Sequence, residues 1–160
     1  MSLIKQPSSR TCFMCGKQND HGLKMEWFND TENNQVVGEI SIPEHFNGYP
    51  GIAHGGIVAT ILDETSGRAV LLDGDFSNLF VTLKLEITYK HPTPTNTPLK
   101  VRGWLVRYGK KSAKVAGSIS LPDGTVTAEC NAIVVRPPKE ITESWKAEIP
   151  YWRVYDENEK

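Results

Sequence analysis

The sequence predicts a single α+β domain in which a largely antiparallel sheet of about six strands surrounds one long helix. Apolar residues recur with a helical period only across residues 57–72. Shorter segments with the alternating pattern of half-buried strands precede and follow that stretch, and tight turns join the later ones, which favours antiparallel pairing. The 160 residues can form one hydrophobic core but are short for two domains.

The first predicted strands are residues 23–29 and 35–41, joined as a hairpin by a polar turn. Residues 1–22, which contain two cysteines, and residues 137–160 lack any period. We therefore expect an N-terminal appendage, a domain at residues 23–136 and a C-terminal extension.

The helix at residues 57–72 carries one broad apolar stripe. Its members are Ile57, Val58, Ile61, Leu62, Thr65, Ala69 and Leu72. Asp63 falls on the opposite side, among the small residues Ala59, Ser66, Gly67 and Val70, which predicts close approach by another molecule. Its neighbour Glu64 has Arg68 one turn later, which predicts an exposed ion pair and a structural or peripheral role for Glu64.

Residues 79–90 alternate strictly and predict the clearest strand. Leu83 is expected on the apolar face with Leu85 and Tyr89, and Thr82 on the polar face. Further strands are expected at residues 99–108, 112–121 and 125–135. The predicted element order is ββαββββ, which leaves the helix stripe to be covered by the sheet.

The helix is preceded by His54, Gly55 and Gly56. A helix N-terminus has unpaired backbone N–H groups and a partial positive charge, so it can polarise a carbonyl that comes close, and the two glycines permit that approach. The alternative is a tight turn in which His54 hydrogen-bonds the loop. Asp63 has no basic residue three or four positions away and is therefore a candidate base or nucleophile.

Composition excludes some functions. With 18 basic and 19 acidic residues, the net charge of −1 gives no general attraction to nucleic acid or to an anionic membrane. No apolar run approaches the roughly 20 residues that cross a bilayer, and residues 1–11 lack the apolar stretch of a secretory signal, so a cytoplasmic location is expected. The three cysteines are then expected as free thiols or metal ligands.

The segment PGIAHGGIVATILDE, followed by the alternating strand and by Tyr89-Lys90-His91-Pro92, resembles hotdog-fold thioesterases of the phenylacetic-acid-pathway and mammalian acyl-CoA thioesterase type. The resemblance covers roughly residues 12–136. It implies a sheet wrapped around a central helix, a homodimer or dimer of dimers with active sites at the subunit interface, and hydrolysis of an acyl-CoA. The acyl group and the number of subunits stay open.

The resemblance also assigns roles to residues. Asp63 matches the catalytic aspartate, Gly56 the amide that polarises the thioester oxygen, and His54 the motif histidine that shapes the turn. Thr82 matches the hydroxyl residue that orients the lytic water. Several relatives carry an amide side chain where this chain has Gly48, and the nearest amide here is Asn47. The resemblance therefore assigns to Asn47 the additional polar contact with the thioester.

Substrate contacts are expected from Gly55 and from basic residues near turns, which can bind the phosphates of coenzyme A. The basic residues are Lys90, Arg107, Lys110, Lys111 and Arg136. No cofactor is expected beyond the coenzyme A of the substrate. Cys12 and Cys15, with His21 after them, have part of a zinc spacing, although a turn that covers a strand edge is the favoured interpretation.

Two function classes remain open. The first is the acyl-CoA thioesterase, favoured by the presence of both Asp63 and Thr82. The second is a non-catalytic acyl-CoA or acyl-carrier binding module on the same fold. A hotdog dehydratase is disfavoured, because it would need a histidine base in the helix region, and residues 57–72 contain none.

Overall fold

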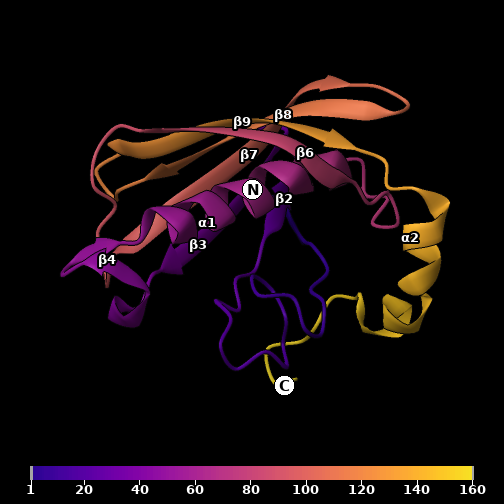
Figure 1. Ribbon diagram of the computed structural model, residues 1–160, viewed down its shortest axis with the longest axis horizontal. Helices are drawn as coiled ribbons and strands as arrows, with labels where there is room; N and C mark the ends of the chain where they lie inside the picture. The colour runs from indigo at the N-terminus through magenta and orange to yellow at the C-terminus, as the bar shows by residue number, and fades with distance from the viewer. Residues whose placement is uncertain (1, 160) are drawn as a thin grey trace.

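Short turns join the last strands of the chain, and these strands form the middle of one antiparallel sheet that curves over the helix (Figure 1). The computed structural model describes residues 2–159. The order across the seven-stranded sheet is β1-β2-β3-β7-β8-β9-β6. Its strands are β1 (Leu3–Lys5), β2 (Phe28–Asp30), β3 (Gln35–Ser41), β6 (Val81–Tyr89), β7 (Pro98–Tyr108), β8 (Ser112–Ser120) and β9 (Val126–Val135).

Smaller elements complete the chain. A 3-10 turn, η1 (Glu44–Phe46), leads into a two-stranded hairpin of β4 (Asn47–Tyr49) and β5 (Ile52–Ala53) just before the helix. Helix α2 (Lys139–Ser144) and the 3-10 turn η3 (Lys146–Tyr151) follow the sheet. None of the helices within residues 2–159 has the length and apolar character needed to span a bilayer.

The central helix α1 (Gly55–Gly67) continues as the 3-10 turn η2 (Arg68–Leu71), close to the predicted bounds. The predicted stripe packs under the sheet: Val58, Ile61, Leu62, Thr65 and Ala69 are all buried. Ser66 and Val70 are buried as well, so their predicted place on an open small-residue face is wrong. The sheet curves far enough around α1 to cover them.

Two glycines make this close packing possible. Gly103 on β7 pairs with Gly117 on β8, and both lie against α1. A methyl group added at Gly103 would lie 2.3 Å from the backbone oxygen of Thr65, and one at Gly117 would lie 3.4 Å from Cβ of Ser66. At Gly103 the helix backbone therefore occupies the space that a side chain would fill.

A β-bulge interrupts the alternation of β6. The pairing of β6 with β9 shifts register between Thr82 and Lys84. One extra residue moves every later side chain to the other face. Thr82 consequently lies on the helix side, as Leu85 does, while Leu83 is 67% exposed. The predicted placement of Leu83 on the apolar face and of Thr82 on the opposite face is therefore wrong.

The predicted strand at residues 23–29 is also mostly wrong, because only Phe28–Asp30 pairs as β2. The residue directly before it packs on the helix instead. Trp27 is 1% exposed, and its Nε1 donates a hydrogen bond to Thr65 Oγ1 at 3.0 Å. Strands β1, β4 and β5 were not expected from the sequence.

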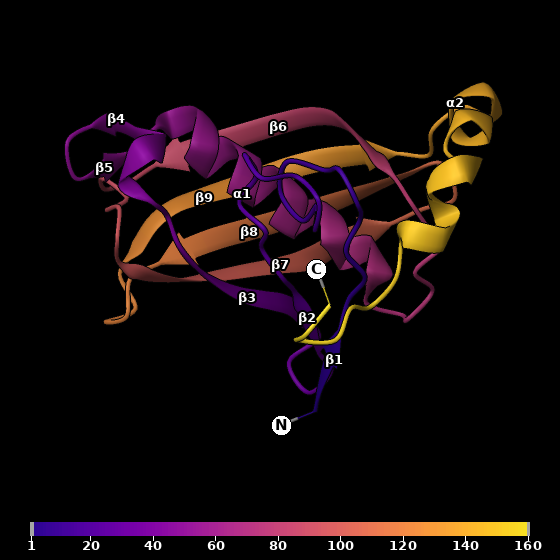
Figure 2. The same cartoon turned by 90° about the horizontal axis from the view of Figure 1, so that it is seen from below.

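The two terminal segments pack against each other on the side of α1 away from the sheet (Figures 1 and 2). Ser8 and Arg153 form an isolated antiparallel bridge, and Arg10 binds Glu148 through both Nε and Nη2. Trp152 Nε1 donates to the carbonyl oxygen of Phe76 at 2.8 Å. The ends of the chain thus form part of the surroundings of α1.

Candidate active site

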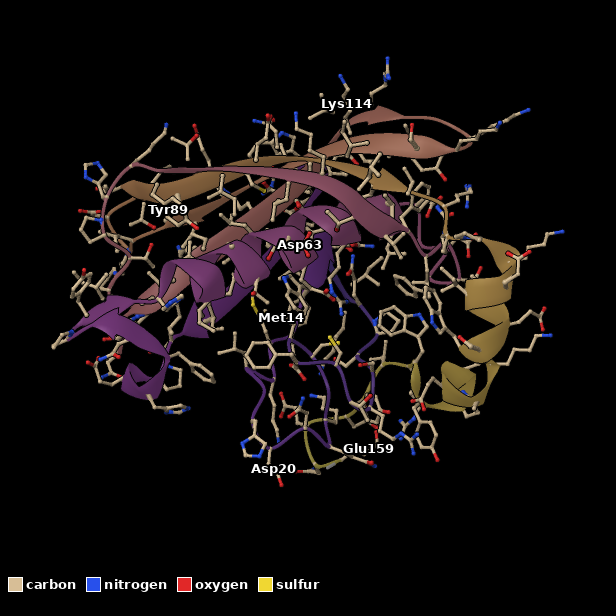
Figure 3. All side chains as sticks on the ribbon, viewed as in Figure 1. Met14, Asp20, Asp63, Tyr89, Lys114 and Glu159 are labelled. Carbon is tan, nitrogen blue, oxygen red and sulfur yellow. The ribbon has the colours of Figure 1, made fainter. Side chains whose placement is uncertain are left out.

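Asp63 and Thr82 meet between α1 and β6. Thr82 Oγ1 donates a hydrogen bond to Asp63 Oδ1 at 2.7 Å. The β6 bulge turns Thr82 toward the helix, and Asp63 projects from the middle of α1 (Figure 3). The bond fixes one carboxylate oxygen and leaves Oδ2 available to accept a proton from a bound water or to attack a carbonyl.

A cavity of about 110 Å³ adjoins this pair. Its wall includes Asp63 and Thr82 together with apolar side chains. The apolar part comes from Val70, Leu71, Leu79, Phe80, Val134 and Trp152. A larger hollow of about 910 Å³ runs along β3 and β7, but none of the predicted catalytic residues lines it. The small cavity is therefore the one that could hold a reacting group beside the carboxylate.

At the start of α1, the side chain of His54 caps the helix. The Gly56 N–H donates to His54 Nδ1 at 2.9 Å, and the three residues His54, Gly55 and Gly56 are all exposed. Tyr89 OH donates to the Gly55 carbonyl oxygen at 2.8 Å and so holds the end of β6 on the first turn. A substrate carbonyl that takes the Gly56 N–H must displace the imidazole, which is open to solvent.

Gly56 and Asp63 lie on the same side of α1 but at different positions along the helix axis. Seven residues make nearly two turns, so the two positions face the same way while their backbones are about 10 Å apart along the axis. One carbonyl group cannot sit within hydrogen-bond distance of both in a single subunit. In Figure 3, Asp63 lies at mid-helix, and Tyr89, whose hydroxyl binds the Gly55 carbonyl oxygen, lies toward the helix start.

Asn47 lies in the hairpin that precedes the helix. Its Nδ2 donates to Glu44 Oε1 at 2.8 Å. Glu44 also accepts hydrogen bonds from Thr95 Oγ1 and from the Gly51 N–H. These hydrogen bonds, of which the one from Thr95 has the largest effect, hold the pKa of the Glu44 carboxyl below its usual value. In this arrangement the Asn47 amide orders the hairpin rather than the helix start.

The basic residues fall at the two ends of β6. Lys90 follows Tyr89 at the end near the helix start and forms an ion pair of 3.1 Å with Glu129. At the other end, the Arg136 guanidinium binds Asn78 Oδ1, the Lys110 carbonyl oxygen and Tyr108 OH, and lies 4.7 Å from the centre of the Phe80 ring. Arg107, Lys110 and Lys111 are exposed beside this second end.

Two residues at the site escaped sequence analysis. Tyr89 was expected as a member of the alternating strand and of the motif that follows it, but its hydrogen bond to the helix start was not predicted. A tyrosine hydroxyl usually has a hydrogen-bond partner when its ring packs inward, and this was the available signal. Trp152 lies in the C-terminal extension, where no periodic pattern of apolar residues indicates a contact with the helix. Glu64, predicted to be in an exposed pair, instead binds an Arg68 side chain that is 4% exposed.

Comparison with known families agrees with this geometry. Residues 50–128, which include α1, Asp63 and Thr82, match the model of the thioesterase superfamily. This part of the chain belongs to the thioesterase superfamily. Its antiparallel sheet around one main helix is the hotdog fold of that superfamily.

Relatives of the thioesterase-superfamily domain include mouse acyl-coenzyme A thioesterase THEM4, which is 33% identical over 101 residues. The match covers 61% of this chain but only 42% of the mouse protein. Among solved structures, a thioesterase superfamily protein is 26% identical with a TM-score of 0.71, covering 79% of this chain and 60% of the other.

A second solved structure shows the same fold. It is a hypothetical thioesterase protein with coenzyme A from Streptococcus pneumoniae, 24% identical with a TM-score of 0.58. The match covers 63% of this chain and 79% of that protein.

Proposed function

We propose that this chain hydrolyses an acyl-CoA thioester to a free acid and coenzyme A, using Asp63 as the base or nucleophile. The observation that carries the proposal is the Asp63 carboxylate, bound by Thr82 at 2.7 Å and open to a cavity. As a base, Asp63 would take a proton from water while that water attacks the thioester carbon. The tetrahedral intermediate would then expel the coenzyme A thiolate.

The carbonyl oxygen of the thioester requires a hydrogen-bond donor. We assign this role to the backbone N–H of Gly56 from a second subunit. The separation of about 10 Å along α1 places the Gly56 amide of the same subunit out of reach. A two-fold axis beside the helix would bring the start of one α1 to the middle of the other, since an isologous contact reverses the direction of each element. Two identical sites would result.

Strand β6 is the natural place for this contact. It is one end of the seven-stranded order, it runs for nine residues, and Leu83 on it is 67% exposed (Figure 2). An unpaired edge strand with an exposed apolar side chain is a template for pairing with a second copy. Antiparallel pairing of two β6 strands would join the sheets and set both helices side by side.

The same arrangement would gather the basic residues. Within one chain, Lys90 and Arg136 lie at opposite ends of β6. A two-fold axis at this strand would place Lys90 of one subunit near Arg107, Lys110 and Lys111 of the other. Such a cluster could bind the phosphates of coenzyme A by charge-assisted hydrogen bonds. Two relatives support this substrate class. Mouse THEM4 is named an acyl-coenzyme A thioesterase, and the Streptococcus protein was solved with coenzyme A.

The direct test is release of free thiol from a panel of short-chain, long-chain and aromatic acyl-CoA thioesters. We expect the purified chain to hydrolyse at least one of them well above the uncatalysed rate, and the preferred acyl group to reveal how far the cavity extends in the assembly. If no member of the panel is hydrolysed while coenzyme A esters still bind, the non-catalytic binding module becomes the better description.

A further inference from the structure

The N-terminal segment places two sulfur atoms against the underside of α1. The Sγ atoms of Cys12 and Cys15 and a carboxylate oxygen of Glu64 all lie within 4.8 Å of one another. Met14 between the cysteines is 3% exposed and lies on the side of α1 away from the sheet (Figure 3). Residues separated by about fifty positions in the chain thus converge on one point.

The turn that holds the cysteines is tightly built. The Gly16 N–H donates to the Cys12 carbonyl oxygen at 2.7 Å, and a methyl group at Gly16 would lie only 2.4 Å from that oxygen. Backbone N–H groups also point at both sulfurs: Met14 donates to Cys12 Sγ at 3.4 Å, and Ser9 donates to Cys15 Sγ at 3.3 Å. Hydrogen bonds from N–H groups favour the thiolate over the thiol.

The cluster has an excess of potential negative charge. Glu64 Oε1 accepts from Arg68 Nε at 3.0 Å, and the Arg68 guanidinium stacks on the Trp27 ring at 4.1 Å. Two thiolates and one carboxylate against a single guanidinium would leave two negative charges, which a divalent cation would neutralise.

We propose that Cys12, Cys15 and Glu64 bind a zinc ion, with a water molecule as fourth ligand. Two sulfurs bound to zinc at about 2.3 Å in a tetrahedral site lie roughly 3.8 Å apart, so the observed spacing needs only a small inward movement. Thiolates prefer zinc to the hard cations magnesium and calcium. Glu64 and Cys12 are partly exposed, which leaves room for the water.

This assignment is independent of the proposed thioesterase activity. A zinc ion would tie residues 12–15 to the helix residue that follows Asp63 in the chain, and so would stabilise the contact between the N-terminal segment and α1. The rival use of the same cysteines is a dithiol that is oxidised to a disulfide by a small-molecule disulfide. That rival does not use the Glu64 carboxylate, which lies beside both sulfurs.

The test is metal binding by the full chain, stripped with a chelator under reducing conditions and titrated with Co²⁺. We expect about one cobalt ion per chain, with the thiolate-to-cobalt charge-transfer band and visible d–d bands of a tetrahedral site, and displacement by Zn²⁺. The double variant C12S/C15S should lose the charge-transfer band. The control Cys130→Ser removes a buried cysteine on β9 and should bind cobalt as the unmodified chain does.

The Glu64→Gln variant tests the contribution of the carboxylate independently of the two sulfurs. It should keep the charge-transfer band but weaken cobalt affinity about 10-fold or more, the scale seen when a metal site loses one supporting group. Circular dichroism before titration confirms that each variant is folded. Absence of stoichiometric metal in the unmodified chain, or equal affinity in Glu64→Gln, would overturn the proposal. So would formation of a Cys12–Cys15 disulfide, two hydrogens lighter, in chain supplied with both Zn²⁺ and glutathione disulfide.

Discussion

Replacement of Asp63 by Asn is expected to reduce kcat for acyl-CoA hydrolysis by about 100-fold or more, the scale of losing a catalytic base or nucleophile. The amide keeps the size of the carboxylate and can still accept the hydrogen bond from Thr82 Oγ1. It cannot accept a proton from water. The substrate should still bind, so KM should change far less than kcat, and thiol release at saturating acyl-CoA measures the difference.

A matched control removes a carboxylate elsewhere. Asp20→Asn changes a side chain that is 90% exposed in the N-terminal segment, and its kcat should stay within about two-fold of that of the unmodified chain. Thr82→Val should give an intermediate loss, because Asp63 keeps its charge but loses its hydrogen bond. An Asp63→Asn chain that turned over at the unmodified rate would remove Asp63 from the mechanism.

Gly103→Ala is expected to destabilise the fold by about 2 to 3 kcal/mol, the upper part of the range for overpacking a core. The added methyl group would lie 2.3 Å from the Thr65 oxygen and 2.9 Å from the Thr65 carbonyl carbon. Both are helix backbone atoms that no rotamer change can move. The helix must therefore shift away from β7, and equilibrium unfolding in urea at a fixed protein concentration measures the cost.

Gly67→Ala is the control for this substitution. Gly67 has helical φ and ψ of −60° and −33°, and an added methyl group meets no atom within 4 Å. Alanine favours helix by up to about 1 kcal/mol over glycine, so this variant should be unchanged or more stable. If Gly103→Ala unfolded at the same urea concentration as the unmodified chain, the close packing of α1 on the sheet would be contradicted.

Local patterns in the sequence predicted the central elements well. The helical stripe from Val58 to Ala69 is buried as expected, and the turns after Tyr108 and Leu121 join antiparallel strands. These features depend on residues that are close together in the sequence, so the spacing of apolar and turn residues is enough to predict them. The hotdog fold followed from the resemblance of the motif that ends at Glu64.

The errors have a common cause: the mispredicted features depend on contacts between parts of the chain that are distant in sequence. The β6 bulge leaves no mark in the alternation from Leu79 to Tyr89, so Leu83 could not be placed on the exposed side. Trp27 was assigned to a strand because its contact with Thr65 is invisible in sequence. Trp152 reaches the cavity from a segment without period.

The central claim, that each site joins Gly56 of one subunit to Asp63 of another, has a direct test in mixed dimers. Gly56→Pro removes the amide hydrogen in the first turn of α1, where proline is tolerated. This variant and Asp63→Asn should each be nearly inactive alone. When they are co-expressed with two different affinity tags and purified through both, every dimer carries one lesion in each subunit.

If the sites are shared, one of the two sites in such a dimer is intact and the other has both lesions, so about half of the unmodified kcat per dimer should return. Thiol release by the doubly purified dimer, compared with each parent at equal concentration, measures this recovery. Activity no higher than that of the parents would place Gly56 and Asp63 in the same subunit and contradict the account.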